Sequence, residues 1–228
     1  MRVCAVILAG GAGVRMGHGV PKQKIEILGE SILKRTLLAF EKNGRVDSIV
    51  VVGSNDTLDF VRGECYGLSK VKKIVVGGKN RVESARCGFL AIDFPCDLVA
   101  VHDGVRCLVS QRDIDTVIDD AIKYGAATAS TPVTDTVKAI DSQGNIVSTV
   151  DRDSLRAVQT PQIFKYELYK RAMECLDTSD LKITDDNSLM EKIGVKVHPS
   201  DTSKYNIKIT YSEDLELAKF ILEGGLSK

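Results

Sequence analysis

The chain of 228 residues has no net charge, because 31 Lys and Arg residues balance 31 Asp and Glu residues. Proteins that bind nucleic acid over a broad surface carry a basic excess, so this balance argues against a nucleic-acid partner. No apolar run is long enough to span a bilayer, and the one at residues 3–8 is too short for the core of a signal peptide. We therefore expect no membrane partner and a cytoplasmic location, and any anion site must be local.

The sequence also lacks a metal-binding pattern of cysteine and histidine. Its six cysteines contain no C-x-x-C pair, and none of its three histidines stands at a metal-ligand spacing from them. Structural zinc sites need such spacings, so zinc is not expected. The cysteines are expected to be reduced and mostly buried.

What the sequence does contain is a regular alternation of short apolar runs and segments of helical period. We expect strands at "VCAVIL", "SIVVVG", "KKIVVG", "DLVAVH" and "AATASTPV", with helices at residues 31–41, 57–64, 81–90 and 111–124. Asn80 and Glu83 predict a capping box at the third helix. The expected fold class is α/β, a doubly wound and mostly parallel sheet with ligands at the carboxyl ends of its strands.

The pattern changes after Thr134. Residues 135–153 read as two alternating strands joined by the turn sequence Ser-Gln-Gly-Asn, which predicts a hairpin arm over about residues 134–152. Further helices are expected at 166–176 and 185–193, strands near "VKVH" and at "NIKIT", and a last helix capped by Thr210 and Glu213. Length and composition fit a single domain over residues 1–228 that carries this arm.

The first strand leads into the glycine-rich stretch "LAGGAGVRMGHGVPKQ" at residues 8–23. A Walker loop needs Lys after its last glycine, whereas His18 follows Gly17. A dinucleotide fingerprint has the spacing G-x-G-x-x-G, whereas Gly11, Gly13 and Gly17 have one residue more. The loop is therefore neither of these two phosphate-binding motifs.

The loop nevertheless has the properties of a phosphate-binding site. Small residues at positions 9–13 let the backbone approach a ligand and point N–H groups at phosphate oxygens. Arg15 and Lys22 add two cations, which suit the charge of a nucleoside triphosphate and of its transition state. The alternative is an ordinary glycine turn with a solvated cation, and the spacing of Arg15 from Pro21, Lys22 and Gln23 favours the phosphate site.

A second candidate site residue, Asp103, follows a buried strand in the segment "VHDGVR". Beside a triphosphate its charge is repulsive unless it contacts Mg²⁺ or a ribose hydroxyl. The alternative is an acidic residue that only turns the chain after the strand.

These motifs together resemble a known family. "LAGGAGVRMG" followed by "PKQ" is similar to the signature of nucleotidyltransferases that activate sugar, polyol and molybdopterin groups. The segments "GGKNRVESARCG", "VHDGVR", "PVTDTVK", "TVDRDSLRAVQTPQIF", "ITDDNSL" and "YNIKIT" resemble the 2-C-methyl-D-erythritol 4-phosphate cytidylyltransferase family of the cytidylyltransferase branch. The resemblance extends from Arg2 to about Leu222.

The resemblance implies a Rossmann-like nucleotidyltransferase that uses Mg²⁺ or another divalent cation. It would transfer CMP from CTP to 2-C-methyl-D-erythritol 4-phosphate and release pyrophosphate, for isoprenoid precursor synthesis. It implies these roles: Arg15 and Lys22 catalytic; Ala9, Gly10, Gly11, Gly13, Gly77, Gly78, Arg81, Ser84 and Asp103 for CTP; Asp103, Arg106, Thr136, Arg152, Thr160, Thr184 and Lys208 for the acceptor; Asp103 for magnesium. Thr136 and Arg152 would come from the arm of a neighbouring subunit, so a homodimer with exchanged arms is expected.

One segment departs from the family pattern. Family members usually read Asp-Ala-Ala-Arg-Pro where this chain reads Asp103-Gly104-Val105-Arg106-Cys107, which puts the direction of the Arg106 side chain in question. The implied chemistry is in-line attack by a phosphate monoester, which needs no general base at neutral pH. Histidines are therefore not required as catalysts, and His102 is expected to be a structural residue.

Three other functions stay open at this point. A ribitol 5-phosphate cytidylyltransferase shares the fold and the "LAGG" signature, but "VDRDSL" and "ITDDNS" fit the isoprenoid family better. An NAD-dependent oxidoreductase is disfavoured by the glycine spacing. A nucleotide-binding regulator without activity is disfavoured by the presence of both Arg15 and Lys22.

Overall fold

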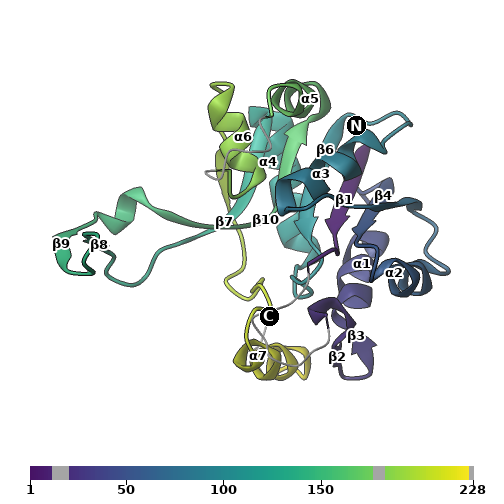
Figure 1. Cartoon of the computed structure of the whole chain (residues 1–228), viewed down its shortest axis with the longest axis horizontal. Helices are drawn as coiled ribbons and strands as arrows, with labels where there is room; N and C mark the ends of the chain where they lie inside the picture. Colours follow the sequence, from purple (N-terminus) through teal and green to yellow (C-terminus); the bar gives the residue numbers. More distant parts are fainter. Residues whose placement is uncertain (12–20, 177–182, 226–228) are drawn as a thin grey trace.

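The centre of the protein is a seven-stranded sheet with the order β11-β7-β10-β6-β1-β4-β5. The computed structural model describes residues 1–11, 21–176 and 183–225. Within the sheet only β10 runs antiparallel to its neighbours, β6 and β7. The strands are β1 (Val3–Leu8), β4 (Ser48–Gly53), β5 (Val71–Val76), β6 (Leu98–Asp103), β7 (Ala126–Pro132), β10 (Arg156–Lys165) and β11 (His198–Asp201) (Figure 1). The expected mostly parallel, doubly wound α/β fold is confirmed.

The middle strands are apolar on both faces because helices cover both sides of the sheet. Residues of β4 and β6 are all buried, which explains their continuous apolar runs. In β1, Ala5 and Ile7 pack on one face, whereas Cys4 and Val6 pack on the other. The parallel register places Leu8 of β1 beside Asp103 of β6, so the glycine-rich stretch begins next to that acidic residue.

Three helices cover each face. One face carries α1 (Ile32–Lys42), α2 (Leu58–Cys65) and α4 (Gln111–Tyr124), and the other carries α3 (Arg81–Leu90), α5 (Tyr166–Glu174) and α6 (Asp186–Lys192). Asn80 caps α3, as predicted, by accepting a hydrogen bond from the Glu83 amide at 2.8 Å. Among the described residues, no helix is both long and apolar enough to cross a membrane.

A smaller apolar cluster lies beyond the carboxyl ends of the strands. It joins α7 (Ser212–Leu222) to the short strand β2 (Glu26–Ile27), which pairs with β3 (Glu30–Ser31) and follows the 3-10 turn η2 (Lys22–Lys24) (Figure 1). Ile209, before α7, and Cys107, after β6, are buried in this cluster. It therefore holds together the segments that leave β1 and β6 and the segment that precedes α7.

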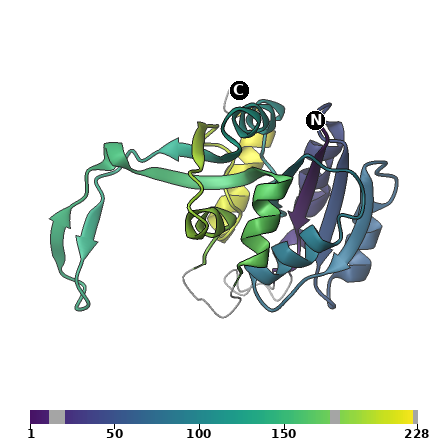
Figure 2. The ribbon, with the colours of Figure 1, turned by 90° about the horizontal axis from the view of Figure 1, so that it is seen from above.

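The predicted hairpin arm is present and projects away from the rest of the chain. Its strands are β8 (Lys138–Ile140) and β9 (Ile146–Thr149), joined by a turn in which Gly144 has a positive φ of 87°, and the short turn η3 (Arg152–Ser154) follows. Figures 1 and 2 show the arm extending from the ends of β7 and β10, with β8 and β9 at its tip. No part of the sheet packs against the tip in either view.

Three sequence predictions of secondary structure were wrong in detail. β10 was not expected, because Pro161 interrupts its apolar run and the pairing with β7 shifts between Val158 and Gln162. The segment "NIKIT" is not a strand, although Ile209 N donates to Val105 O at 3.0 Å. The strand expected near "VKVH" begins only at the last residue of that segment.

The start of the last helix also differs from the prediction. Asp214, rather than Glu213, accepts hydrogen bonds from the amides of Thr210 and Tyr211, at 2.7 and 2.8 Å. The two acidic residues are neighbours, and only the one that faces back along the helix axis reaches the free N–H groups. The expected cap is therefore made one residue later.

Candidate active site

Two adjoining cavities open at the carboxyl ends of β1 and β6. The larger has a volume of about 460 Å³, and the smaller has a volume of about 280 Å³. The larger is lined by Leu8, Ala9, Gly10, Gly11, Lys22, Gln23, Gly78, Lys79, Asn80, Arg81, Ser84, Asp103, Val105, Lys208, Ile209 and Thr210. The smaller is lined by Arg81, Asp103, Arg106, Val158, Gln159, Thr160, Gln162, Thr184, Asp185 and Lys208. This is the edge of the sheet where the fold class predicts ligands.

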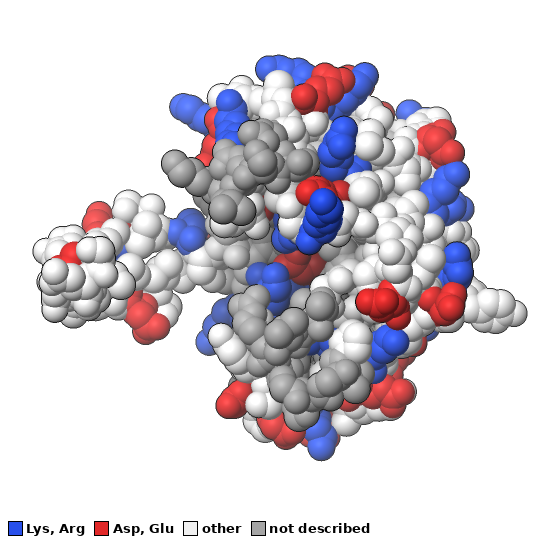
Figure 3. Space-filling view, viewed as in Figure 1, with Lys and Arg blue, Asp and Glu red and all other residues white. Residues whose placement is uncertain are grey.

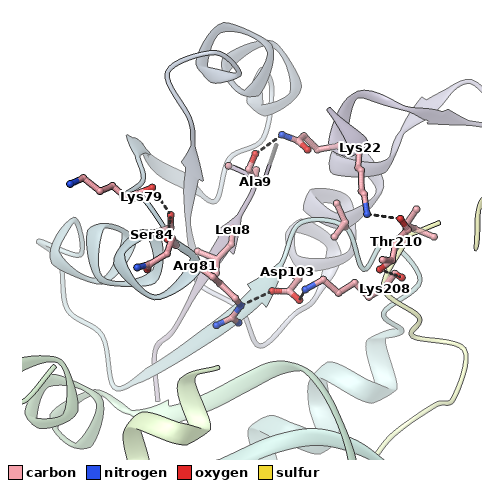
Figure 4. Close-up of a pocket in the computed structure, with 16 residues that line it drawn as sticks. Leu8, Ala9, Lys22, Lys79, Arg81, Ser84, Asp103, Lys208 and Thr210 are labelled. Atoms are coloured by element: carbon pink, nitrogen blue, oxygen red, sulfur yellow. Dashed lines mark hydrogen bonds and ion pairs between the residues drawn. The ribbon is translucent and has the colours of Figure 1, made fainter. Parts of the chain in front are cut away.

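Three charged residues belong to both cavities and form the wall that they share. Asp103, at the end of β6, accepts from Arg81 Nε at 3.1 Å on one carboxylate oxygen and from Lys208 Nζ at 2.9 Å on the other. Figure 4 shows the three side chains in a row, with Asp103 between the two cations. A molecule in either cavity therefore lies beside the same two positive charges.

Arg81 and Asp103 form a buried ion pair in the shared wall, and each raises the stability of the other's charged form. Burial alone would raise the pKa of Asp103, but the charges of Arg81 and Lys208 outweigh burial and hold that pKa well below its usual range. Burial would likewise lower the pKa of Arg81, whereas the carboxylates of Asp186 and Asp103 raise it. Both ions of the pair are consequently charged at neutral pH.

Arg81 is fixed from behind by a buried carboxylate. Asp186, the first residue of α6, accepts from Arg81 at 2.7 Å and from the hydroxyl of Tyr169 at 2.6 Å. Its own amide donates to the Gln162 side chain at 3.0 Å, which links α6 to β10. Asp186 and Tyr169 are fully buried and line neither cavity, so they act on the site through Arg81.

Backbone and small side chains form the other wall of the larger cavity. Ala9, Gly10 and Gly11 follow β1 there, opposite Gly78 and the first turn of α3. A Cβ atom on Gly78 would lie 2.2 Å from the Glu83 Cβ, so glycine is needed at this position. Gly78 therefore allows the close packing of the turn before α3 against Glu83, whereas a Cβ atom on Gly11 would meet nothing within 4 Å.

The exit of the glycine-rich stretch is anchored at two points. Lys22 is buried, and its ammonium group donates to Thr210 O at 2.6 Å, ahead of α7. The Gln23 side chain donates to Ala9 O at 2.9 Å, which ties both ends of the stretch together. Figure 4 shows Lys22 directed across the cavity toward the segment that carries Thr210 and Lys208.

The smaller cavity contains the predicted acceptor residues of the chain's main body. Arg106, Thr160 and Thr184 line it, together with the shared wall. Arg106 donates to Asn206 O at 2.8 Å, and its Nε lies 3.7 Å from Asp103, so its direction is fixed without the proline usual in the family. Cys107 stands where family members usually have proline, and its side chain is buried in the α7 cluster. Arg106 nevertheless lines the smaller cavity.

Some predicted site residues lie outside the described residues, and others line neither cavity. Gly13 and Arg15 lie outside the described residues. Gly77 lines neither cavity, and it supports the site through Ser84, whose Oγ would lie 2.6 Å from a Cβ atom placed on Gly77. Thr136 and Arg152 are exposed on the arm, where Arg152 donates to Thr134 O at 2.8 Å.

Some residues of the site were missed by the sequence analysis. Gln23, Lys79, Asn80 and Thr210 line the larger cavity, and Gln159, Gln162 and Asp185 line the smaller one. Most of them lie within the motifs that carry the family resemblance, beside a residue that was named. The signal available was this adjacency, but sequence alone does not show which neighbours face a cavity.

The magnesium prediction for Asp103 gains no support from the geometry. Its two oxygens already meet Arg81 and Lys208, with Arg106 at 3.7 Å, and three nearby cations repel a divalent ion. No cluster of three possible metal ligands occurs within residues 1–11, 21–176 and 183–225. A resident divalent ion on Asp103 therefore fits these surroundings poorly.

Charges of both signs meet at the mouth of the site. The space-filling view of the face seen in Figure 1 shows basic and acidic side chains together in the central hollow, while the outer surface carries scattered charges of both signs (Figure 3). The fold, with two cavities that share a charged wall at the carboxyl ends of the strands, is typical of a nucleotidyltransferase, an enzyme class that brings a nucleotide together with a second substrate.

Comparison with known proteins identifies the family. The family model described as "IspD: 2-C-methyl-D-erythritol 4-phosphate cytidylyltransferase" matches residues 3–224. The protein of that name from Clostridium perfringens is 40% identical over 228 residues, covering 97% of this chain and 99% of its own. The 4-diphosphocytidyl-2C-methyl-D-erythritol synthase structure from Anaerococcus prevotii superposes with a TM-score of 0.86 and 32% identity, covering 97% and 96% of the two chains.

A second curated relative agrees with the first. The 2-C-methyl-D-erythritol 4-phosphate cytidylyltransferase from Syntrophus aciditrophicus is 38% identical over 225 residues, covering 97% of this chain and 96% of its own. The chain belongs to the 2-C-methyl-D-erythritol 4-phosphate cytidylyltransferase family, as the motifs indicated, and is a nucleotidyltransferase enzyme. This membership removes the oxidoreductase and the inactive regulator from the alternatives.

Proposed function

We propose that the protein transfers CMP from CTP to 2-C-methyl-D-erythritol 4-phosphate, forming 4-diphosphocytidyl-2-C-methyl-D-erythritol and pyrophosphate, in isoprenoid precursor synthesis. The observation that carries the proposal is the pair of cavities with a common wall of Arg81, Asp103 and Lys208. Two anionic substrates placed on either side of that wall meet at its cations. The family to which the chain belongs supports the identity of both substrates.

The larger cavity is the proposed CTP site. Backbone groups of Ala9, Gly10 and Gly11 and the first turn of α3 suit a cytidine, whose base edge needs donors and acceptors. Lys22, with Arg15, would hold the triphosphate and stabilise charge that develops on the α-phosphate. Magnesium enters this scheme as MgCTP, carried by the phosphates of the substrate rather than by Asp103.

The smaller cavity is the proposed acceptor site. Arg106 and Lys208 are its cations for a second phosphate group, and Thr160 and Thr184 supply hydroxyls. The acceptor phosphate attacks the α-phosphorus in line with the departing pyrophosphate, so no bond to the enzyme forms. The protein contributes orientation and charge stabilisation, because a phosphate monoester is already ionised at neutral pH.

The arm is proposed to complete the acceptor site of a second subunit. Its tip exposes the apolar side chains of Ile140, Ile146 and Val147, each at least 60% accessible, which favours coverage by another protein surface. We therefore propose a homodimer with exchanged arms, in which Thr136 and Arg152 reach the acceptor in the partner's cavity. The cytoplasm is the proposed compartment, and six free cysteines agree with a reducing one.

Following the phosphorus atoms tests this scheme. With CTP labelled at the α-phosphorus, we expect the label in the acceptor product and none in pyrophosphate. With CTP labelled at the γ-phosphorus, we expect all label in pyrophosphate. Labelled acceptor from γ-labelled CTP would indicate a kinase, and CMP release without acceptor would indicate a hydrolase, so either result would refute the proposal.

A further inference from the structure

His102 is a buried polar side chain that contacts two residues of the smaller cavity. It lies on β6 just before Asp103, is fully buried against the ring of Phe40, and lines neither cavity. Its Nδ1 lies 3.0 Å from the Thr160 hydroxyl oxygen, and its Nε2 lies 3.2 Å from Arg106 O. Both of these partners belong to residues of the proposed acceptor cavity.

The two partners determine which ring nitrogen carries the proton. A carbonyl oxygen can only accept, so Nε2 donates to Arg106 O. The ring is neutral, since burial lowers the pKa of His102 to about 3, and Nδ1 therefore carries a lone pair. The Thr160 hydroxyl consequently donates its single hydrogen to Nδ1.

The hydrogen bond to His102 limits the hydrogen bonds that the Thr160 hydroxyl can make with a bound molecule. Thr160 Oγ1 also accepts from the Asp103 amide at 3.1 Å, so only its remaining lone-pair capacity is available at the cavity. Toward a ligand the hydroxyl can therefore accept but cannot donate. An ionised phosphate offers only acceptors, whereas the hydroxyl of an alcohol can donate to Thr160.

We propose that His102 is a positioning residue for the acceptor: by taking the hydrogen of Thr160, it makes Thr160 the recognition group for one free hydroxyl of a polyol phosphate. The inference rests on the proposed function, because it treats the smaller cavity as the acceptor site. The proposal gives the residues of the smaller cavity two different roles. Arg106 and Lys208 bind the phosphate, and Thr160 selects for a hydroxylated chain.

The same histidine also fixes the turn that carries Arg106. Its Nε2 holds Arg106 O, while the Arg106 amide donates to Asp103 O at 3.0 Å. Thr160, on β10, is thus connected through one ring to the turn after β6. The hydroxyl group and the cation are held at a constant separation, as recognition of a phosphate and a hydroxyl on one molecule requires.

Substitution of His102 by glutamine separates its two contacts. In His102→Gln the amide N–H can still donate to Arg106 O from the position of Nε2. The amide oxygen then points away from the position of Nδ1, so the Thr160 hydrogen loses its acceptor. We expect KM for 2-C-methyl-D-erythritol 4-phosphate to rise about three- to tenfold, the worth of one neutral hydrogen bond, with KM for CTP unchanged. His198→Gln is the matched control, because His198 lines neither cavity, and it should change neither constant.

Acceptor analogues that each lack one hydroxyl separate recognition from a merely structural role. In the wild type, one analogue should lose about three- to tenfold in kcat/KM through loss of its bond to Thr160. In Thr160→Val that analogue should react as well as the full acceptor, while the other analogues keep their wild-type losses. Thr160→Ser should restore the wild-type pattern. These variants decide the question even if His102→Gln does not fold.

The outcomes separate this inference from the proposed function. Suppose that wild-type enzyme turns over the acceptor, but every analogue loses the same factor in kcat/KM with Thr160→Val as with the wild type. The role of Thr160 in hydroxyl recognition is then overturned. Equal rises of KM for CTP and for the acceptor in His102→Gln would also overturn it. No pyrophosphate release by wild-type enzyme with the polyol phosphate would instead overturn the proposed function.

Discussion

At the scale of single residues, the site depends on pairing a few charges rather than on a general base. Asp103 is enclosed by Arg81 and Lys208, and Arg81 is held from behind by Asp186. Such pairs are costly to break from one side, because the remaining buried charge is left without compensation. The arrangement keeps cations available at the border of two cavities without a net charge on the chain.

Among the cations within the described residues, Lys22 is the one whose removal should lower kcat most. For Lys22→Ala we expect kcat to fall by about 10²–10³, by analogy with removal of one preorganised donor to a transition-state oxyanion. The same loss is expected for Arg15→Ala. Steady-state pyrophosphate release measures both, and Lys24→Ala, two residues along in η2 and outside both cavities, is the control. Near-wild-type turnover of Lys22→Ala would contradict its catalytic role.

The depressed pKa of Asp103 predicts an acid-sensitive contribution to stability. Because the folded-state pKa lies below the unfolded value of about 3.9, the contribution is complete at neutral pH and is lost as the pH falls below about 4. The difference in unfolding free energy between wild type and Asp103→Asn should be constant from pH 7 to 5 and shrink toward pH 3. Urea unfolding at each pH measures it.

The exposed Asp56 provides the comparison for this experiment. Wild type and Asp56→Asn should unfold alike at every pH. A difference between wild type and Asp103→Asn that does not change with pH would show that the carboxylate is not held in its charged form by its partners.

At the scale of residues, the sequence indicated which residues belong to the site better than it indicated which of them contact one another. The motifs named Arg81, Asp103 and Lys208 separately, and the structure joins them in one wall. The support of Arg81 by Asp186 and Tyr169 could not be predicted, because these residues lie more than 80 positions further along the chain. Such contacts depend on which helices share a face of the sheet.

At the scale of elements, the strands that sequence predicted well are those with uninterrupted apolar runs. β1, β4 and β6 are buried on both faces, so every residue contributes to the signal. β10 lies in the middle of the sheet, but Pro161 and a shift in register conceal it. "NIKIT" alternates as a strand does because Ile207 and Ile209 pack toward α7, although no neighbouring strand pairs with it.

The cap of α3 tests how the start of a helix contributes to the larger cavity, which Asn80 itself lines. Asn80 accepts from the Glu83 amide and begins the helix that carries Arg81 and Ser84 into the larger cavity. We expect Asn80→Ala to lower the unfolding free energy by about 1 kcal/mol and to raise KM for CTP. Thermal or urea unfolding and steady-state kinetics measure the two effects.

Ser110, which caps α4, is the matched control for this helix. Its side chain likewise accepts from the amide three residues on, here that of Asp113, but Ser110 lines neither cavity. Ser110→Ala should cost a similar amount of stability, about 1 kcal/mol, while KM for CTP stays at its wild-type value. An equal rise of KM in both variants would mean that general destabilisation, not the position of α3, sets CTP binding.

At the scale of the whole molecule, a single chain does not explain why the arm projects from the body and exposes apolar side chains. It projects from the body in both ribbon views, and its tip exposes apolar side chains. Sequence predicted the hairpin from its turn and its alternation, but these patterns cannot show which surface covers it. Arg152, on this arm, lines neither of the two cavities of the candidate site.

Mixing two impaired variants tests the exchange of arms. Arg152→Ala should weaken acceptor binding and leave CTP affinity unchanged, whereas Lys138→Ala, another cation of the arm, should leave both unchanged. Lys208→Ala should impair the acceptor site of the main body. Random reassociation of Arg152→Ala with Lys208→Ala chains would restore about a quarter of wild-type activity, because half of the dimers regain one of their two sites. Activity that stays at the level of the separate variants would contradict the exchange.

The choice of acceptor tests the central claim most directly. Pyrophosphate release should be measured with purified protein, MgCTP and either 2-C-methyl-D-erythritol 4-phosphate or ribitol 5-phosphate at equal concentrations. The account predicts turnover with the first acceptor and background release with the second or with CTP alone. Turnover with ribitol 5-phosphate alone would contradict the proposed acceptor and move the reaction to cell-surface polymers, although the CTP site and the chemistry would stand.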